Sequence, residues 1–202
     1  LVMPLFMFMA GVSLPFSLAK YTKAGSRKQV YLRIGKRFVL LFVLGMVVQG
    51  NLLGLDPGNL KLYNNTLQAI AVGYVIAALL VMHCPEKYRL LAAAALLLIY
   101  WLPMRLCGDY TMTGSFAAKV DGLVLGRFRG DPSYTWIWSS LNFGVTVILG
   151  SFAGTMMKND RNSVKVVYKL LITGIACIVT GLLWGLEMPI IKRLWTSSMT
   201  LF

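Results

Sequence analysis

The chain has little acidic charge, few cysteines and a single histidine, and these shortages exclude several classes of protein. Its 202 residues include 7 acidic residues, 3 cysteines and 1 histidine, His83. No His-Glu-x-x-His motif or closely spaced cysteine pair is present, so we expect no metal cofactor. No glycine-rich loop that could hold a phosphate precedes a predicted helix. The sequence therefore carries none of the common soluble-enzyme motifs.

Apolar residues are abundant instead. They make up 57% of the sequence, against 13% charged residues, which lies outside the usual range of soluble domains. The composition predicts an integral membrane protein. The chain opens and closes inside apolar runs, without an initiator Met or a charged leader. We therefore interpret residues 1–202 as a single transmembrane domain that is part of a larger multi-span one.

Uncharged runs define the predicted fold, which is an all-α, polytopic transmembrane bundle with six spans and the start of a seventh. The runs are 1–19, 38–55, 62–85, 90–104, 132–157, 170–186 and 194–202. Pro4, Gly11 and Pro15 predict a kinked or broken first span. The fourth run is only about 22 Å long as a helix, so it must either recruit flanking residues or thin the bilayer locally. Pro103 is expected to end it.

Basic residues gather on one side of this topology. Alternating the spans places 13 basic and 2 acidic residues on one side, and 7 basic and 5 acidic residues on the other. The first side is therefore assigned to the cytoplasm. The net charge of +13 then reflects membrane topology, and we expect no nucleic-acid partner.

Several other features predict structure without chemistry. The three cysteines fall at different membrane depths and cannot form disulfides with one another. In the outer segment 105–131, apolar residues at helical spacing predict a helix at the membrane surface. These residues are Phe116, Val120, Leu123 and Val124. Glycines four residues apart predict close helix packing, at Gly150 with Gly154 and at Gly181 with Gly185.

The stretch 63–83 joins a polar head to a long uncharged run. Asn64, Asn65 and Thr66 can cap a helix at the outer face. Gln68 lies one turn deeper, where hydrocarbon offers it no hydrogen-bond partner. It either bonds a neighbouring helix or contacts a ligand. At the other end of the run, His83 is interpreted as a solvated interfacial residue, since nothing nearby in the sequence would orient it.

A basic segment, 20–37, lies on the cytoplasmic side. It could bind anionic lipid or a phosphorylated cofactor such as a nucleotide or coenzyme A, or it could simply fix the topology. On the outer side, Asp121 is interpreted as a surface charge unless it faces a cavity. Trp195 is either an interface anchor or a surface on which a sugar could stack, and Ser197 lies beside it.

Four segments, taken in order, resemble the heparan-alpha-glucosaminide N-acetyltransferase family and its bacterial relatives. They are 1–13 (LVMPLFMFMAGVS), 67–71 (LQAIA), 120–126 (VDGLVLG) with Asp131-Pro132, and 192–198 (KRLWTSS). The resemblance implies a multi-span acyltransferase that takes an acetyl group from cytoplasmic acetyl-CoA. The acceptor would be an amine or hydroxyl of a sugar or glycan on the outer side.

The resemblance also carries expectations for the site and its surroundings. The catalytic histidine of the family is expected just before the Met-Pro stretch, which places it ahead of Leu1, and His83 does not match it. The chain has Gln68-Ala69 where the family often has Gln-Arg, and Ser133-Tyr134 where it often has Glu-Gly, so the acceptor stays open. Membrane lipid, a glycan acceptor and a homodimer partner are expected, in a bacterial inner membrane.

We combine these interpretations into one assignment. The cofactor-binding candidates are Arg27, Lys28, Arg33 and Arg37, and the substrate or acyl-transfer candidates are Asn65, Gln68, Asp121, Trp195 and Ser197. An amide near the transfer point could stabilise charge that develops in the transition state. A sugar or small-molecule transporter, or a non-catalytic membrane subunit, is the alternative, because broken helices and amides within the membrane also serve transport.

Overall fold

A computed structural model describes residues 2–22, 27–54, 58–160 and 163–202. Its helices are α1 (Val2–Thr22), α2 (Arg27–Gln49), α3 (Thr66–His83), α4 (Glu86–Cys107), α5 (Phe116–Leu125), α6 (Ser140–Asn159), α7 (Ser163–Gly185) and α8 (Ser197–Leu201), with short 3₁₀ helices η1 (Leu52–Gly54) and η2 (Gly126–Phe128). Over these residues the only strand-like pairing is a single bridge between Tyr63 and Arg129. The predicted all-helical fold is confirmed.

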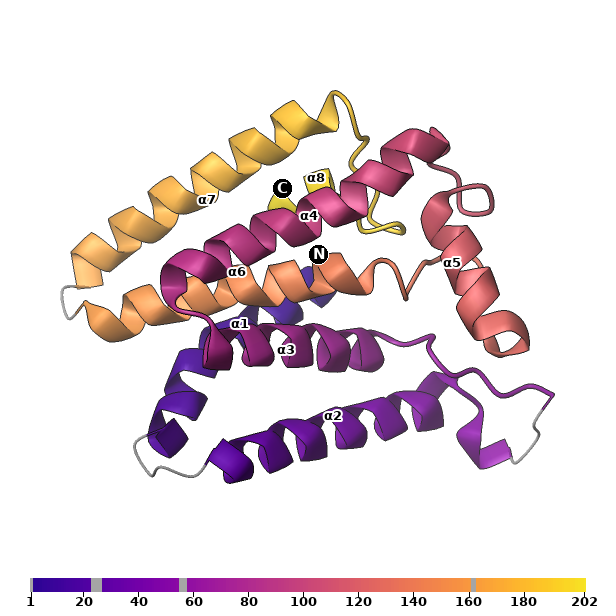
Figure 1. Cartoon of the computed structure of the whole chain (residues 1–202), viewed down its shortest axis with the longest axis horizontal. Coiled ribbons are helices and arrows are strands. Elements are labelled where there is room, and N and C mark those ends of the chain that lie inside the picture. Colours follow the sequence, from indigo (N-terminus) through magenta and orange to yellow (C-terminus); the bar gives the residue numbers. More distant parts are fainter. Residues whose placement is uncertain (1, 23–26, 55–57, 161–162) are drawn as a thin grey trace.

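The long helices lie side by side, and α5 lies across one end of them (Figure 1). The start of α2, the junction of α3 with α4 and the end of α6 gather at the opposite end, at the left of the figure. This is the end that the sequence assigns to the cytoplasm. The helix predicted at the outer membrane surface corresponds to α5, whose Leu123 is 87% exposed.

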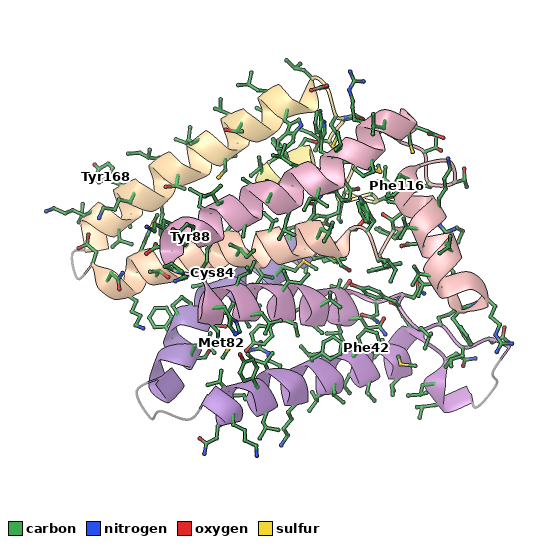
Figure 2. The ribbon with its side chains drawn as sticks, in the orientation of Figure 1. Phe42, Met82, Cys84, Tyr88, Phe116 and Tyr168 are labelled. Carbon is green, nitrogen blue, oxygen red and sulfur yellow. The ribbon has the colours of Figure 1, made fainter. Side chains whose placement is uncertain are left out.

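Among the described residues, four helices, α3, α4, α6 and α7, are long and apolar enough to cross a membrane, so the chain is a membrane protein. The apolar part of α1, Val2–Leu18, is shorter, and α2 carries charge in its first half. The count of six spans and part of a seventh therefore stays a prediction. α7 is the least buried of the four spans, and Tyr168 points away from the bundle (Figure 2).

Local sequence signals explain four of the helix ends. Asn65, Ser115 and Thr196 each accept a backbone N–H at the start of α3, α5 and α8, respectively. Gly108 ends α4 in a left-handed conformation with φ of 65°, which glycine adopts without steric cost.

The predicted end of the fourth span at Pro103 is absent, and the first span is not broken, while the predicted kink in it stays a prediction. α4 continues past Pro103 and stops only at the left-handed Gly108, because a proline near a helix end removes just one hydrogen bond. By recruiting flanking residues at both ends, α4 reaches the 22 residues that a span needs. α1 runs as one helix through Pro15. Its packing along α6 holds it there, and Lys158 Nζ donates to the Pro15 carbonyl at 3.0 Å.

Glycines bring α1 and α6 into backbone contact at the centre of the bundle. A Cβ atom placed on Gly150 would overlap the Phe8 carbonyl oxygen, and one on Gly154 would overlap that of Val12. Gly11 meets the Val147 carbonyl in the same way. The close packing predicted from the spacing of Gly150 and Gly154 is confirmed. α6 is consequently the most buried of the candidate spans, at 67%.

We expect Gly150→Ala to destabilise the protein by about 1–3 kcal/mol, because the new methyl group forces two backbones apart. Gly174→Ala is the matched control, since nothing lies within 4 Å of a Cβ at Gly174 and alanine favours the helix. Thermal unfolding in detergent measures both. Equal unfolding temperatures for the two variants would contradict the packing that we describe.

Candidate functional site

Polar side chains are buried at the outer end of the bundle, where α4 and α6 meet the chain that follows α7. Those on α6 and the turn before it are Thr135, Ser139, Ser140, Asn142 and Thr146, and those that follow α7 are Thr196, Ser197 and Ser198. We call this set the outer polar cluster. Without water nearby, each such group needs a protein partner.

The cluster holds the non-helical segment 186–196. Tyr100 Oη and Ser139 Oγ both donate to the Leu194 carbonyl, at 2.6 and 2.9 Å. Ser197 Oγ donates to the Leu97 carbonyl on α4 at 2.9 Å. Thr196 and Ser198 bond carbonyls at the end of the turn that follows α7. Side chains from α4, from α8 and from the turn before α6 thus fix an irregular backbone, which is tolerated at membrane depth only when buried in protein.

Trp195 lies inside this segment with φ of 51°, a conformation that a bulky residue rarely adopts. Its carbonyl accepts from Asn142 Nδ2 at 2.6 Å, and its Nε1 donates to Thr146 Oγ1 at 3.4 Å. The ring packs edge to face with Phe143, with centroids 5.0 Å apart, and only 4% of Trp195 is exposed. The indole is therefore packed inward. A sugar could stack on it only if this segment moved.

Asn142 carries an unused hydrogen-bond acceptor. The residue is fully buried, and its Oδ1 has no donor among the described residues. Its orientation is fixed, since a flipped amide would place Oδ1 against the Trp195 carbonyl oxygen. Leaving a buried acceptor unpaired costs about 1–3 kcal/mol. Asn142 is thus a candidate to receive an N–H or O–H group, and a lone asparagine in an apolar span was the signal that sequence reasoning missed.

Gln68 and Asn65 form a complete capping box at the start of α3. Gln68 Oε1 accepts the backbone N–H groups of Asn64 and Asn65, at 2.9 and 3.0 Å. Its Nε2 donates to the carbonyls of Leu62 at 2.7 Å and Phe42 of α2 at 3.5 Å. The amide therefore makes an interhelical bond and is fully used. No described hydrogen bond joins Asn65 or Gln68 to Trp195 or Ser197, so an acyl-transfer role for them stays a prediction.

Asp121 is completely buried, so its interpretation as a surface charge is wrong. α5 lies across the bundle end and turns Asp121 inward, while Leu123 faces out. The two carboxylate oxygens accept the backbone N–H groups of Trp136 and Ile137, at 2.7 and 2.8 Å. These groups belong to the turn that leads into α6. Burial raises the pKa of Asp121, while both hydrogen bonds and the nearby Arg129 guanidinium lower it.

The basic candidates differ in their surroundings at the bundle end that the sequence assigns to the cytoplasm. Arg37 lies over the Tyr74 ring of α3, with Cζ 4.4 Å from the centroid. Lys28 and Arg33 are exposed, and the Arg27 side chain lies outside the described residues. These cations could bind phosphate groups. Within the described residues, no group of three or more His, Cys, Asp or Glu side chains is arranged to hold a metal ion.

His83 has two hydrogen bonds, so the expectation that nothing orients it is wrong. Its Nδ1 lies 2.8 Å from the Leu79 carbonyl, which can only accept, so Nδ1 carries the proton. In the neutral ring Nε2 then accepts from the Tyr31 hydroxyl at 2.7 Å. Tyr31 comes from α2, which is 52 positions away in the chain and therefore invisible to local sequence reasoning.

We expect Asp121→Asn to destabilise the protein by about 1–3 kcal/mol. An amide offers one oxygen to the two N–H groups and turns its own N–H group towards the other donor. Asp109→Asn is the control, because Asp109 is partly exposed and interacts with one residue, Thr111, whose backbone N–H and side chain both bond its carboxylate. Unfolding temperatures in detergent compare the two variants, and an equal loss in both would contradict the capping role of Asp121.

We also expect Arg129→Gln to raise the pKa of Asp121 further, because the guanidinium lowers it. The pKa of Asp121 is already raised in the folded protein, so its contribution to stability is fully present below the unfolded pKa. That contribution is lost as the pH rises through the folded pKa. NMR titration of ¹³C-labelled aspartate measures the shift, with Lys119→Gln as control. An unchanged or lower pKa in Arg129→Gln would contradict this coupling.

The sequence of the chain was compared with known proteins and with models of protein families. A comparison with individual curated proteins gives no match. The family model for the catalytic domain of heparan-alpha-glucosaminide N-acetyltransferase matches residues 1–181, which include α1 to α6 and most of α7. This region contains Asn142, Asp121 and the basic start of α2. The chain therefore belongs to the heparan-alpha-glucosaminide N-acetyltransferase catalytic family.

Proposed function

We propose that the protein transfers an acetyl group from cytoplasmic acetyl-CoA to an amine or hydroxyl of a sugar or glycan on the outer side of a bacterial inner membrane. Membership of the acetyltransferase family supports this proposal. The two ends of the helix bundle also differ in the way that this reaction requires, with a cofactor at one end and a sugar at the other. Cations gather at the end assigned to the cytoplasm, and buried hydrogen-bonding groups gather at the outer end.

Within this proposal, the basic start of α2 attracts the phosphates of coenzyme A. Arg27, Lys28, Arg33 and Arg37 supply the positive charge. Arg37 is the best placed of the described candidates, because its guanidinium rests on Tyr74 between α2 and α3. A planar guanidinium held in this way can bind a phosphate with two hydrogen bonds.

The unpaired Oδ1 of Asn142 is the observation that carries the proposal at the outer end. Phe8 lies beside Gly150 and Val12 beside Gly154, so α1 and α6 run in the same direction with a constant register. If the helix of α1 continues backwards, this register brings residues just before Leu1 level with Asn142. The family resemblance implies a catalytic histidine there. Asn142 Oδ1 would accept one imidazole N–H and so orient the ring.

The other imidazole nitrogen would then act as the base. It takes the proton from the acceptor amine or hydroxyl as the acceptor attacks the thioester carbonyl carbon. The new C–N or C–O bond forms, the C–S bond breaks, and the coenzyme A sulfur leaves and takes up a proton. Asn142 is a positioning residue in this scheme, acting through the histidine.

Acetyl transfer from radiolabelled acetyl-CoA to a panel of amino sugars tests the proposal, using the full-length protein in membranes. We expect transfer, and a loss of about tenfold or more in kcat for Asn142→Ala, because a misoriented base contributes less. Ser151→Ala is the matched control, since Ser151 is equally buried on α6 and bonds only the Ile148 carbonyl.

Two outcomes would overturn the proposal. Equal kcat values for Asn142→Ala and Ser151→Ala would remove the positioning role of Asn142. An absence of transfer to any acceptor, together with sugar uptake into vesicles without an acetyl donor, would favour the transporter.

A further inference from the structure

α2 presents two different faces. Val30 and Ile34 are buried against the bundle, and Gly45 approaches the Gln68 side chain of α3. The opposite face carries residues spaced at i, i+4, i+7 and i+8, which are Lys28, Leu32, Gly35 and Lys36. All of these are exposed. The cytoplasmic half of α2 is therefore cationic on the side that faces away from α3.

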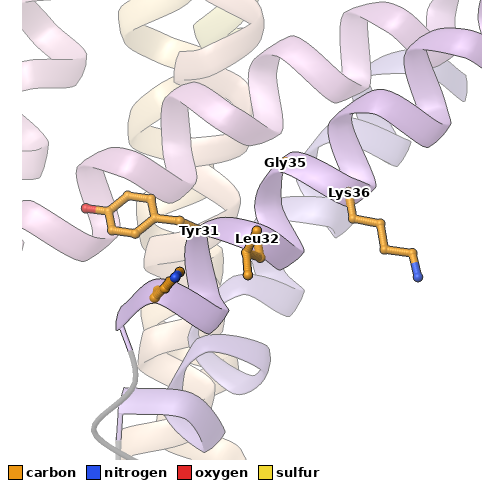
Figure 3. A pocket seen from close by; sticks show the side chains of 5 residues that line it. Tyr31, Leu32, Gly35 and Lys36 are labelled. Carbon is orange, nitrogen blue, oxygen red and sulfur yellow. The ribbon is translucent and has the colours of Figure 1, made fainter.

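This exposed face contains a hollow. It is open, has a volume of about 720 Å³, and is lined by Lys28, Tyr31, Leu32, Gly35 and Lys36. Figure 3 shows Tyr31 and Lys36 diverging on either side of Leu32. Nothing lies within 4 Å of a Cβ placed on Gly35, so no packing contact requires glycine there. The missing side chain leaves room on the helix surface, although glycine weakens a helix relative to alanine.

The charge in the hollow is of one sign and is not neutralised. Lys28 and Lys36 make no hydrogen bond or ion pair within the described residues. None of the described residues that line the hollow is acidic. Lys28 and Lys36 both line the hollow that Gly35 leaves open, so a negatively charged oxygen group in the hollow would be attracted by both ammonium groups.

Apolar side chains continue the same face towards the middle of the bundle. Leu32 is 64% exposed, Val39 57% and Val43 44%. These positions carry no charge and follow the helical spacing of the lysines. A ligand with a phosphate group and a hydrocarbon chain matches this order of cations and apolar residues, from the cytoplasmic surface inwards.

We propose that the hollow on α2 binds the phosphate of an anionic phospholipid between Lys28 and Lys36, with an acyl chain along Leu32, Val39 and Val43. Coenzyme A offers the same phosphate chemistry, but its polar remainder does not match an apolar surface turned away from α3. Arg37 lies on the inward side, over Tyr74. This inference assigns Lys28 to lipid together with Lys36, and it leaves Arg27, Arg33 and Arg37 as the candidates for the cofactor.

Native mass spectrometry of the full-length protein with phosphatidylglycerol and phosphatidylcholine tests this inference. We expect tighter binding of phosphatidylglycerol, weakened about fivefold by Lys28→Gln or Lys36→Gln, since each lysine contributes separately. Gly35→Leu should weaken binding as well, by filling the hollow without changing the charge. Lys87→Gln is the matched control, because it removes one charge at the same membrane face, outside the hollow.

Four results would overturn the inference. They are equal binding of the two lipids, an equal loss in Lys87→Gln and Lys36→Gln, unchanged binding in Gly35→Leu, and displacement of the lipid by coenzyme A. All the substituted side chains are exposed or border open space, so the fold should persist, and circular dichroism checks this. Lipid binding is measured without acetyl transfer, so failure of the acetyltransferase proposal would leave this result unaffected.

Discussion

A polar group inside a membrane protein has no water to bond with, and the outer end of this bundle is organised around that constraint. Segment 186–196 is not helical, so its carbonyls need donors from elsewhere. Tyr100 and Ser139 both donate to the Leu194 carbonyl, and Asn142 donates to that of Trp195. These bonds hold Trp195 in its rare left-handed conformation. Asn142 Oδ1 is the one atom that can only accept among the buried side-chain atoms that lack a partner in the described residues, the others being on Trp101, Tyr110, Arg129 and Trp136. It is therefore available to a donor from a ligand or another side chain.

Close packing of α1 on α6 links this polar end to the rest of the protein. Gly11, Gly150 and Gly154 let the two backbones touch, and the constant register fixes which residues share a level. The same contact between α1 and α6 keeps α1 helical through Pro15. A shift of one helix would move the outer end of α1 away from Asn142. The contact between α1 and α6 therefore sets the relative position of the groups to which we assign catalysis, although its glycines take no part in the reaction.

The two faces of α2 carry positive charge for two different roles. Its inward face supports α3, where Phe42 and Gly45 approach Gln68 and where Arg37 lies over Tyr74. Its outward face combines Lys28 and Lys36 with apolar residues that continue into the membrane. One helix can thus contact a cofactor on one side and lipid on the other. The positive-inside rule accounts for the number of cations but not for this division between faces.

The sequence by itself determined the helical membrane fold, the close glycine packing of α1 on α6 and the family, because these follow from composition, spacing and ordered local motifs. Capping residues such as Asn65 were also readable, since a cap acts within one turn. Tertiary structure alone decided that Asp121 is buried, that Trp195 packs inward and that Tyr31 orients His83. Tertiary structure also decided that Gly108, and not Pro103, ends α4. Each of these outcomes depends on a partner distant in the chain or on a backbone angle. Periodicity and composition describe single segments, and the partners of a buried polar group are chosen only when segments pack together.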